Sequence, residues 1–258
     1  MALTFSKEAA RNIRKKIEVD LKFGPVPEVK ISTFHSFCAQ LIRECSEELG
    51  IRSDFGILDE TGIAVMIYKQ GTEAFEAKRI ANTVGKAKDL NIPLEKFEDY
   101  CKKLEKELEV YCKKEDFEGF AAKCRIELNT LYLSLKAGKS KDVGVEDFLE
   151  SFKEYSKYQL LVDSWKKIEV EKKKRNVLDY GDLNALALTA LRKGFAKQFT
   201  EGIRHVIVDE FQDTNSVQFE LLKLLTLEGG EITAVGDQNQ SIYAFRGART
   251  SVIEDFKK

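Results

Sequence analysis

The sequence predicts an α/β protein in which a parallel sheet flanked by helices is interrupted by an all-helical insertion. Residues 1–55 and 176–258 alternate apolar, strand-like runs with helical patterns, which is typical of βαβ units around a parallel sheet. Residues 56–175, between them, carry almost no strand signal. We therefore expect both ends of the chain to build one sheet domain.

The first segment contains two strand–helix pairs. "ALTF" precedes the helical "KEAARNIRKKIEVDL", and "VKIST" precedes "FHSFCAQLIRECSEELG". Apolar residues between Phe34 and Cys45 recur at the i, i+3, i+4 spacing of a buried helical face, and Ser32 or Thr33 is a suitable N-cap.

The last segment repeats this pattern, with "HVIVD" and "ITAVG" separated by the helical "SVQFELLKLLTLE". Parallel strands place their carboxyl ends at one edge of a sheet, where ligands bind. We expect four neighbouring strands, at Leu3–Phe5, Val29–Ser32, Arg204–Asp209 and Ile232–Val235.

The middle segment is rich in Lys and Glu at helical spacing, as in "LEKFEDYCKKLEKELEVYCKKEDFEGFAAKC". Gly and Asp interrupt its heptads, which favours the surface helices of a small bundle over a coiled coil. Its basic run at residues 172–175 is expected to contact single- and double-stranded nucleic acid alike.

The composition is that of an ordinary globular protein, with 43% hydrophobic residues and a net charge of −1. This charge does not support a broadly basic surface, although a local basic groove stays possible. No apolar run is long enough to span a membrane, and no signal-peptide pattern is present. The five cysteines form no C-x-x-C pair, so we expect a reducing, cytoplasmic environment and no membrane partner.

An acidic pair ends the strand in "VIVDEFQDTN", where Asp209 and Glu210 are adjacent and Asp213 follows. Buried carboxylates need a compensating cation or hydrogen bonds. One interpretation is Mg²⁺ carrying a nucleoside triphosphate, with the first acid on the metal and the second on the attacking water. The alternative is a strand-end pair that caps the next helix or pairs with a surface lysine.

The next strand leads into "ITAVGDQNQSIYAFRGA", which places an amide, two aromatic rings and a guanidinium close together. Gln240 is suited to a γ-phosphate or the attacking water, and Tyr243 and Phe245 to stacking on bases. Arg246 matches a phosphate or carboxylate. The alternative is a pair of core aromatic residues with a surface arginine.

Together these segments resemble the UvrD/Rep-type superfamily 1 DNA helicases. "DEFQDTN" is similar to motif II and "VGDQNQSIYAFRGA" to motif III of that family. "LTFSKEAA" resembles motif Ia, "ISTFHSF" motif Ib, and "LDYGDL" the acidic motif before motif II; all five occur in the family order. The resemblance covers essentially the whole chain and implies a RecA-like fold of the P-loop NTPase type.

The resemblance also implies roles for individual residues. Asp209 would coordinate Mg²⁺, Glu210 would activate water, and Gln240 would sense the γ-phosphate of ATP, while Gln212 would link this site to the moving parts. Phe5, Tyr243 and Phe245 would contact bases of single-stranded DNA, Thr33 and His35 its backbone, and Arg246 would connect the DNA and ATP sites. Without the resemblance, His35 would be interpreted as a capping residue at the start of a helix.

The phosphate-binding pattern G-x-x-x-x-G-K-[ST] does not occur in these 258 residues. "KAGKS", at Gly138, Lys139 and Ser140, lacks the first glycine and a preceding strand, so it is interpreted as a polar loop. We therefore expect a helicase fragment that is inactive alone.

The resemblance implies that the parent uses ATP to move 3′ to 5′ on single-stranded DNA and to unwind duplex at single/double-strand junctions, in DNA repair or replication. Its partners would be this DNA and the remaining helicase domains. Two alternatives stay open: a non-catalytic DNA-binding or protein-interaction module, and a metal-dependent nuclease using Asp179, Asp182, Asp209 and Glu210.

Overall fold

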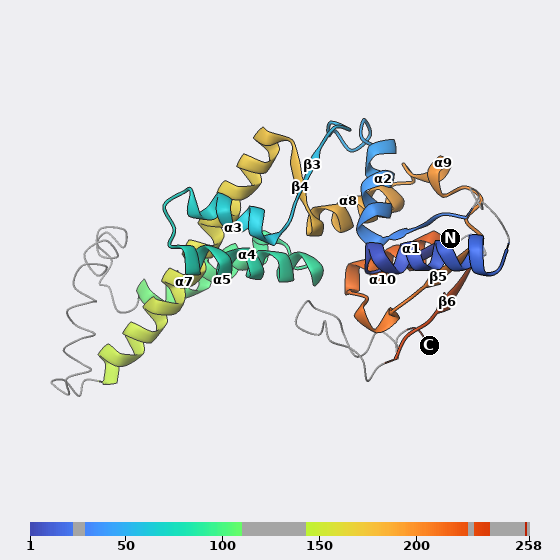
Figure 1. Cartoon of the computed structure of the whole chain (residues 1–258). Helices are drawn as coiled ribbons and strands as arrows, with labels where there is room; N and C mark the ends of the chain where they lie inside the picture. The colour runs from blue at the N-terminus through green and yellow to red at the C-terminus, as the bar shows by residue number, and fades with distance from the viewer. Residues whose placement is uncertain (23–28, 110–142, 227–229, 238–255, 257–258) are drawn as a thin grey trace. The chain divides into compact units, whose positions relative to one another are not determined.

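The computed structural model describes residues 1–22, 29–109, 143–226, 230–237 and 256 (Figure 1). The chain forms two compact units. One combines Met1–Ile92 with Ile168–Lys258 and contains the sheet; the other is Pro93–Lys167.

The main sheet has four neighbouring parallel strands, as the sequence predicts, and their order is β2-β1-β5-β6. The strands are β1 (Ala2–Thr4), β2 (Ile31–Thr33), β5 (His205–Val208) and β6 (Glu231–Ala234). Ala2 of β1 lies opposite Ile31 of β2 and Ile207 of β5. Because all four strands are parallel, the residues that follow them meet at one edge of the sheet.

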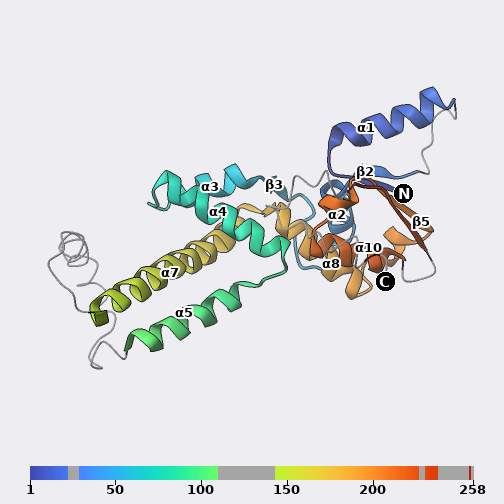
Figure 2. The ribbon, with the colours of Figure 1, turned by 90° about the horizontal axis from the view of Figure 1, so that it is seen from below.

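Helices α2 (Phe34–Glu44), α8 (Tyr180–Arg192) and α10 (Ser216–Thr226) share one hydrophobic core with the sheet. Val206 and Val208 of β5 are fully buried in this core, together with Leu41 of α2 and Leu183 of α8. Helix α1 (Lys7–Lys15) packs beside β1 and β2, on the side of the sheet opposite α2, α8 and α10 (Figure 2). This helix explains why every residue of β1 is buried.

A second, two-stranded parallel sheet pairs β3 (Gly56–Leu58) with β4 (Val177–Asp179). The sequence pattern did not predict β3, which falls where only helices were expected. Each strand has three residues, so pairing across the chain and not a local apolar pattern determines it.

Helices α3 (Glu60–Tyr68) and α4 (Ala74–Asp89) pack together, and α4 also packs against α8. They therefore belong to the compact unit that holds the sheet, although the sequence pattern groups them with the insertion. The domain boundaries at 55/56 and 175/176 stay a prediction, since the compact units divide at Ile92 and Lys167 instead.

The second unit is helical in its described part. It contains α5 (Leu94–Glu109) and the first part of α7 (Val143–Arg175). Aromatic pairs join the two helices: the ring centroids of Phe97 and Trp165 are 5.6 Å apart, and those of Tyr100 and Tyr158 are 4.9 Å apart. The "KAGKS" segment lies outside the described residues.

The remaining elements are η1 (Lys16–Asp20), α9 (Lys197–Thr200) and η2 (Phe211–Asp213). None of the described helices combines the length and apolar character that crossing a membrane requires.

Candidate functional site

The acidic pair lies where β5 ends, at the edge of the sheet. The backbone N–H of Asp209 donates to the carbonyl of Leu3 (3.0 Å), and the N–H of Phe211 donates to the carbonyl of Val235 (2.9 Å). Between them, Glu210 has φ 54° and ψ 44°, the left-handed region that non-glycine residues rarely adopt. Such backbone strain occurs at functional sites, where the surrounding contacts enforce it.

Gln212 supplies one of these contacts and is almost fully buried. Its side-chain Nε2 donates to Glu210 Oε2 (2.6 Å), and its Oε1 accepts from the backbone N–H of Asp237 (3.0 Å). Gly236 makes this possible, because a Cβ there would overlap Gln212 Oε1 and lie 3.0 Å from the N atom of Phe211. One amide therefore connects the Glu210 carboxylate to the segment that follows β6.

The Asp209 carboxylate suits a hard divalent cation. Within the described part of the chain it forms no hydrogen bond or ion pair, and it follows an internal strand at the ligand-binding edge of the sheet. Carboxylate oxygens are the ligands that Mg²⁺ prefers. Asp209 therefore fits the metal ligand that the sequence predicts.

A cavity of about 300 Å³ lies at the same sheet edge. It is lined by Phe5, Lys7, Thr33, His35, Ser36, Ile57 and Tyr180. The ring centroids of His35 and Tyr180 are 4.5 Å apart, and those of Phe5 and Phe34 are 5.4 Å apart. Thr33 also caps α2, since its Oγ1 accepts from the N–H of Ser36 (3.2 Å).

The structure brings together part of the predicted set. Phe5, Thr33 and His35 share the cavity, and Glu210 and Gln212 are hydrogen-bonded to each other. Gln240, Tyr243, Phe245 and Arg246 lie outside the described residues.

Sequence reasoning missed four residues that line the cavity: Lys7, Ser36, Ile57 and Tyr180. Tyr180 had a detectable signal, because it is an aromatic residue inside the acidic "LDYGDL" segment, where the carboxylates on either side are the more obvious candidates.

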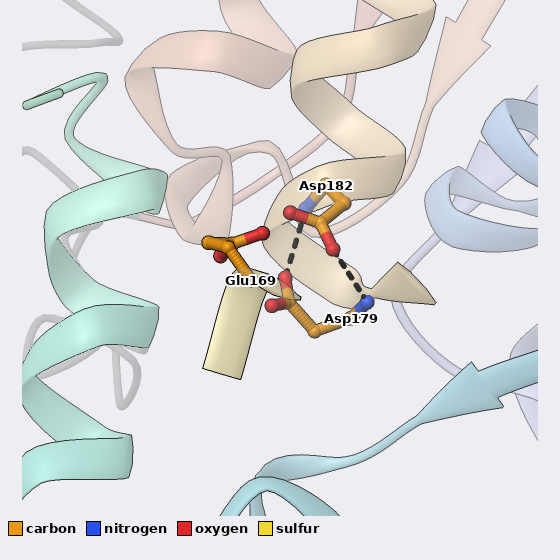
Figure 3. A group of neighbouring side chains, drawn as sticks. All are labelled: Glu169, Asp179 and Asp182. Carbon is orange, nitrogen blue, oxygen red and sulfur yellow. Dashed lines mark hydrogen bonds between the residues drawn. The ribbon is translucent and has the colours of Figure 1, made fainter. Parts of the chain in front are cut away.

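The acids of that segment have a different environment from Asp209. Asp179, Asp182 and Glu169 converge with their carboxylate oxygens within 4.8 Å of one another (Figure 3). Lys88 Nζ lies 2.7 Å from Asp179 and 2.6 Å from Asp182, and Lys172 Nζ lies 2.6 and 2.5 Å from the same residues. Both lysines also contact Glu169, at 2.8 and 3.0 Å. We call these five residues the ion cluster.

Electrostatics within the ion cluster favour the charged forms of Asp179 and Lys88 and oppose that of Asp182. Burial opposes ionisation of Asp179, but the ammonium groups of Lys88 and Lys172 hold the pKa of its carboxyl well below the usual range. Burial together with the neighbouring Asp179 carboxylate raises the pKa of Asp182. Burial would lower the pKa of Lys88, yet Asp179, Asp182 and Glu169 raise it above its usual value.

The ion cluster argues against a nuclease site built from Asp179, Asp182, Asp209 and Glu210. Two ammonium groups take the positions next to the first two carboxylates that a metal ion would need. In the described ranges, the acidic group close enough to share a metal ion contains Glu169 in place of Asp209 and Glu210.

The cluster includes one residue of the basic run at 172–175, whose contact with nucleic acid stays a prediction. Lys172 is only 2% exposed and bonds the carboxylates of the cluster, so its ammonium group does not face solvent. The Arg175 side chain pairs with Glu171 and is 50% exposed. Lys173, Lys174 and Arg175 are the exposed members of the run.

A parallel α/β sheet with an acidic pair after an internal strand is the architecture of nucleotide-hydrolysing motor domains. The aromatic cavity at the same edge adds a surface suited to unstacked bases. The chain belongs to the UvrD/Rep helicase family, because the model of the UvrD/REP helicase N-terminal domain matches residues 1–258.

Individual relatives agree. ATP-dependent DNA helicase Rep of Buchnera aphidicola (subsp. Acyrthosiphon pisum) is 28% identical over 259 residues, covering 100% of this chain and 33% of the relative. ATP-dependent DNA helicase UvrD1 of Mycobacterium tuberculosis is 28% identical over 269 residues, which cover 100% of this chain and 29% of the relative. ATP-dependent DNA helicase srs2 of Schizosaccharomyces pombe is 27% identical, over 98% of this chain and 26% of the relative. The chain thus spans about a third or less of these relatives.

Proposed function

We propose that this chain contributes part of the ATP site and one wall of the single-stranded DNA track in an ATP-dependent DNA helicase. The observation that carries the proposal is the convergence at one sheet edge: Phe5 follows β1, Thr33 ends β2, and Asp209 follows β5. The parent protein would hydrolyse ATP to translocate 3′ to 5′ and unwind duplex.

At the ATP site, Asp209 would hold Mg²⁺, and Glu210 would orient the attacking water. A bound Mg²⁺ ion supplies charge neutralisation on the transferred phosphate. Gln212 keeps the Glu210 carboxylate in place through its 2.6 Å hydrogen bond and ties it to Asp237 through the 3.0 Å bond to its N–H. Gln240, on the same segment, would sense the γ-phosphate.

At the DNA site, Phe5 and the Tyr180–His35 pair would contact unstacked bases, and Lys7 would contact the phosphate backbone. Tyr243 and Phe245 would extend the stacking surface, and Arg246 would join it to the ATP site. Stacking on aromatic side chains depends little on sequence, which suits a protein that travels along a strand.

Fluorescence anisotropy with a labelled oligonucleotide at low salt tests the DNA site in this chain. We expect weak, salt-sensitive binding that prefers single strands to duplex, and losses of about 1 kcal/mol for Phe5→Ala and for Tyr180→Ala. Tyr68→Ala is the matched control, because Tyr68 is an exposed tyrosine on α3 that does not line the cavity.

Equal affinity for single strands and duplex, or aromatic variants that bind like the unmodified chain, would contradict the proposed DNA site. In that outcome the non-catalytic interaction module becomes the better interpretation of the chain.

A further inference from the structure

The ion cluster surrounds the first turn of α8, which carries Tyr180. Lys88 comes from α4, Glu169 and Lys172 come from the end of α7, and Asp179 and Asp182 lie on either side of Tyr180 in sequence. Helix α4, which is distant in the chain, therefore meets the end of α7 and the start of α8 around one helical turn. All five members belong to the same compact unit.

Asp179 and Asp182 connect the ion cluster to the backbone of this turn. The Asp182 N–H donates to Asp179 Oδ1 (2.9 Å), and the Asp179 N–H donates to Asp182 Oδ2 (2.9 Å), which forms a reciprocal capping box. Each carboxylate thus bonds both a lysine and the backbone on either side of Tyr180. The two lysines therefore bond carboxylates that are themselves hydrogen-bonded to the backbone of the turn.

Gly181 brings α4 against the same turn. A Cβ at Gly181 would lie 2.6 Å from Lys88 Cβ and 2.7 Å from Lys88 Cδ, so the lysine stem rests on the glycine backbone. Lys88 therefore contacts the turn through its stem as well as its ammonium group.

Tyr180 projects from this turn to the cavity. Its side chain is 44% exposed, and its ring lies 4.5 Å from that of His35 on α2. Few other contacts hold so exposed a ring, so its direction depends on the backbone beneath it. Neither lysine of the ion cluster lines the cavity.

We propose that Lys88 and Lys172 are positioning residues for the DNA cavity: by fixing the first turn of α8, they hold the Tyr180 ring against His35. The inference rests on the proposed function in one respect, namely that the cavity binds DNA. The positioning itself concerns contacts within this chain and has its own readout.

NMR of the histidine rings supplies that readout, since the chain has two histidines, His35 and His205. Tyr180→Leu removes the ring current and defines the His35 resonances expected without stacking. Lys172→Met, in the full chain, should move the His35 resonances toward those positions and leave His205 unchanged. Lys173→Met is the matched control, because it removes the same charge from the exposed neighbouring residue and should move neither histidine.

Removing one partner of a buried ion group can unfold a protein. The paired variant Glu169→Gln/Lys172→Met removes one charge of each sign, so the net charge of the cluster is kept. The two charged groups that α7 contributes to the cluster are lost, together with their ion pairs. The same His35 shift is expected from it. His35 resonances that stay at their original positions in a folded Lys172 variant overturn the inference.

Binding of a labelled single-stranded oligonucleotide adds a second measurement. Lys172→Met and Tyr180→Leu should each weaken binding, on the order of tenfold, and the double variant should be no weaker than Tyr180→Leu alone. Additive losses would overturn positioning through Tyr180. If the unmodified chain binds no single-stranded DNA, the proposed function fails, and the His35 shift still decides the inference.

Discussion

Replacing Gly181 by alanine should destabilise the sheet-containing unit, although alanine is the better helix former. In a helix interior the glycine-to-alanine change stabilises by up to about 1 kcal/mol. Here the new Cβ would lie 2.6 Å from Lys88 Cβ, far inside van der Waals contact, and Lys88 Cβ is too close to the backbone of α4 to move alone. Overpacking of this kind costs about 1–3 kcal/mol. We expect a net loss of about 1–2 kcal/mol in unfolding free energy.

Gly85→Ala is the matched control for this variant. Gly85 lies within α4, one turn before Lys88, and a Cβ there would meet nothing within 4 Å. It should stabilise by roughly 0.5–1 kcal/mol. Urea unfolding followed by circular dichroism compares the two variants, because the single tryptophan, Trp165, belongs to the other compact unit. If Gly181→Ala stabilises as much as Gly85→Ala, the described contact between Lys88 and the first turn of α8 is wrong.

Three further predictions concern charge and nucleotide. Gln212→Glu would replace the amide donor to Glu210 by a second carboxylate and should lower the unfolding free energy by about 1 kcal/mol in urea unfolding at neutral pH, with Gln70→Glu as an exposed control. The pKa values of Asp179 and Glu169 are lowered in the folded state, so these two residues stabilise the fold above about pH 4 and lose that effect as the pH falls. The pKa of Lys88 is raised, so Lys88 stabilises the fold below about pH 10.5. The raised pKa of Asp182 has the opposite effect on the pH dependence. We still expect the urea midpoint of the unmodified chain to exceed that of Lys88→Met, by a difference that shrinks below about pH 4. Finally, calorimetry should detect no micromolar ATP binding by this chain alone, and DNA-stimulated phosphate release that Glu210→Gln abolishes would contradict this.

The main sheet could be predicted because its strands are short apolar runs bounded by polar residues. Each expected strand lies within two residues of an observed one, and the N-cap of α2 is Thr33, one of the two candidates. The β3–β4 pair could not be predicted, because its residues "GIL" and "VLD" carry no alternation and depend on a partner more than a hundred positions away.

The end of α7 illustrates the same limit. The helix ends at Arg175 because Asn176 adopts a left-handed conformation with φ 53°, a termination that the sequence suggests. The change from one compact unit to the other falls inside this helix, at Ile168. Since the helical pattern continues through that point, periodicity marks the end of the helix and not the boundary of the unit.

The two acidic segments show most clearly what the sequence determines and what it does not. In "VIVDEFQDTN" and "LDYGDL", carboxylates follow a strand, but only Asp179 is buried enough to demand compensation, since Asp209 is half-buried and Glu210 is exposed. For Asp179 and Asp182 that compensation is internal: Lys88 and Lys172 approach from other helices, and no local pattern identifies them. The half-buried Asp209 carboxylate has no such cation among the described residues. Similar acids in similar places therefore have different surroundings: two lysines bond Asp179 and Asp182 within a turn of the fold, whereas Asp209 has no such partner among the described residues and is the ligand that we propose for Mg²⁺.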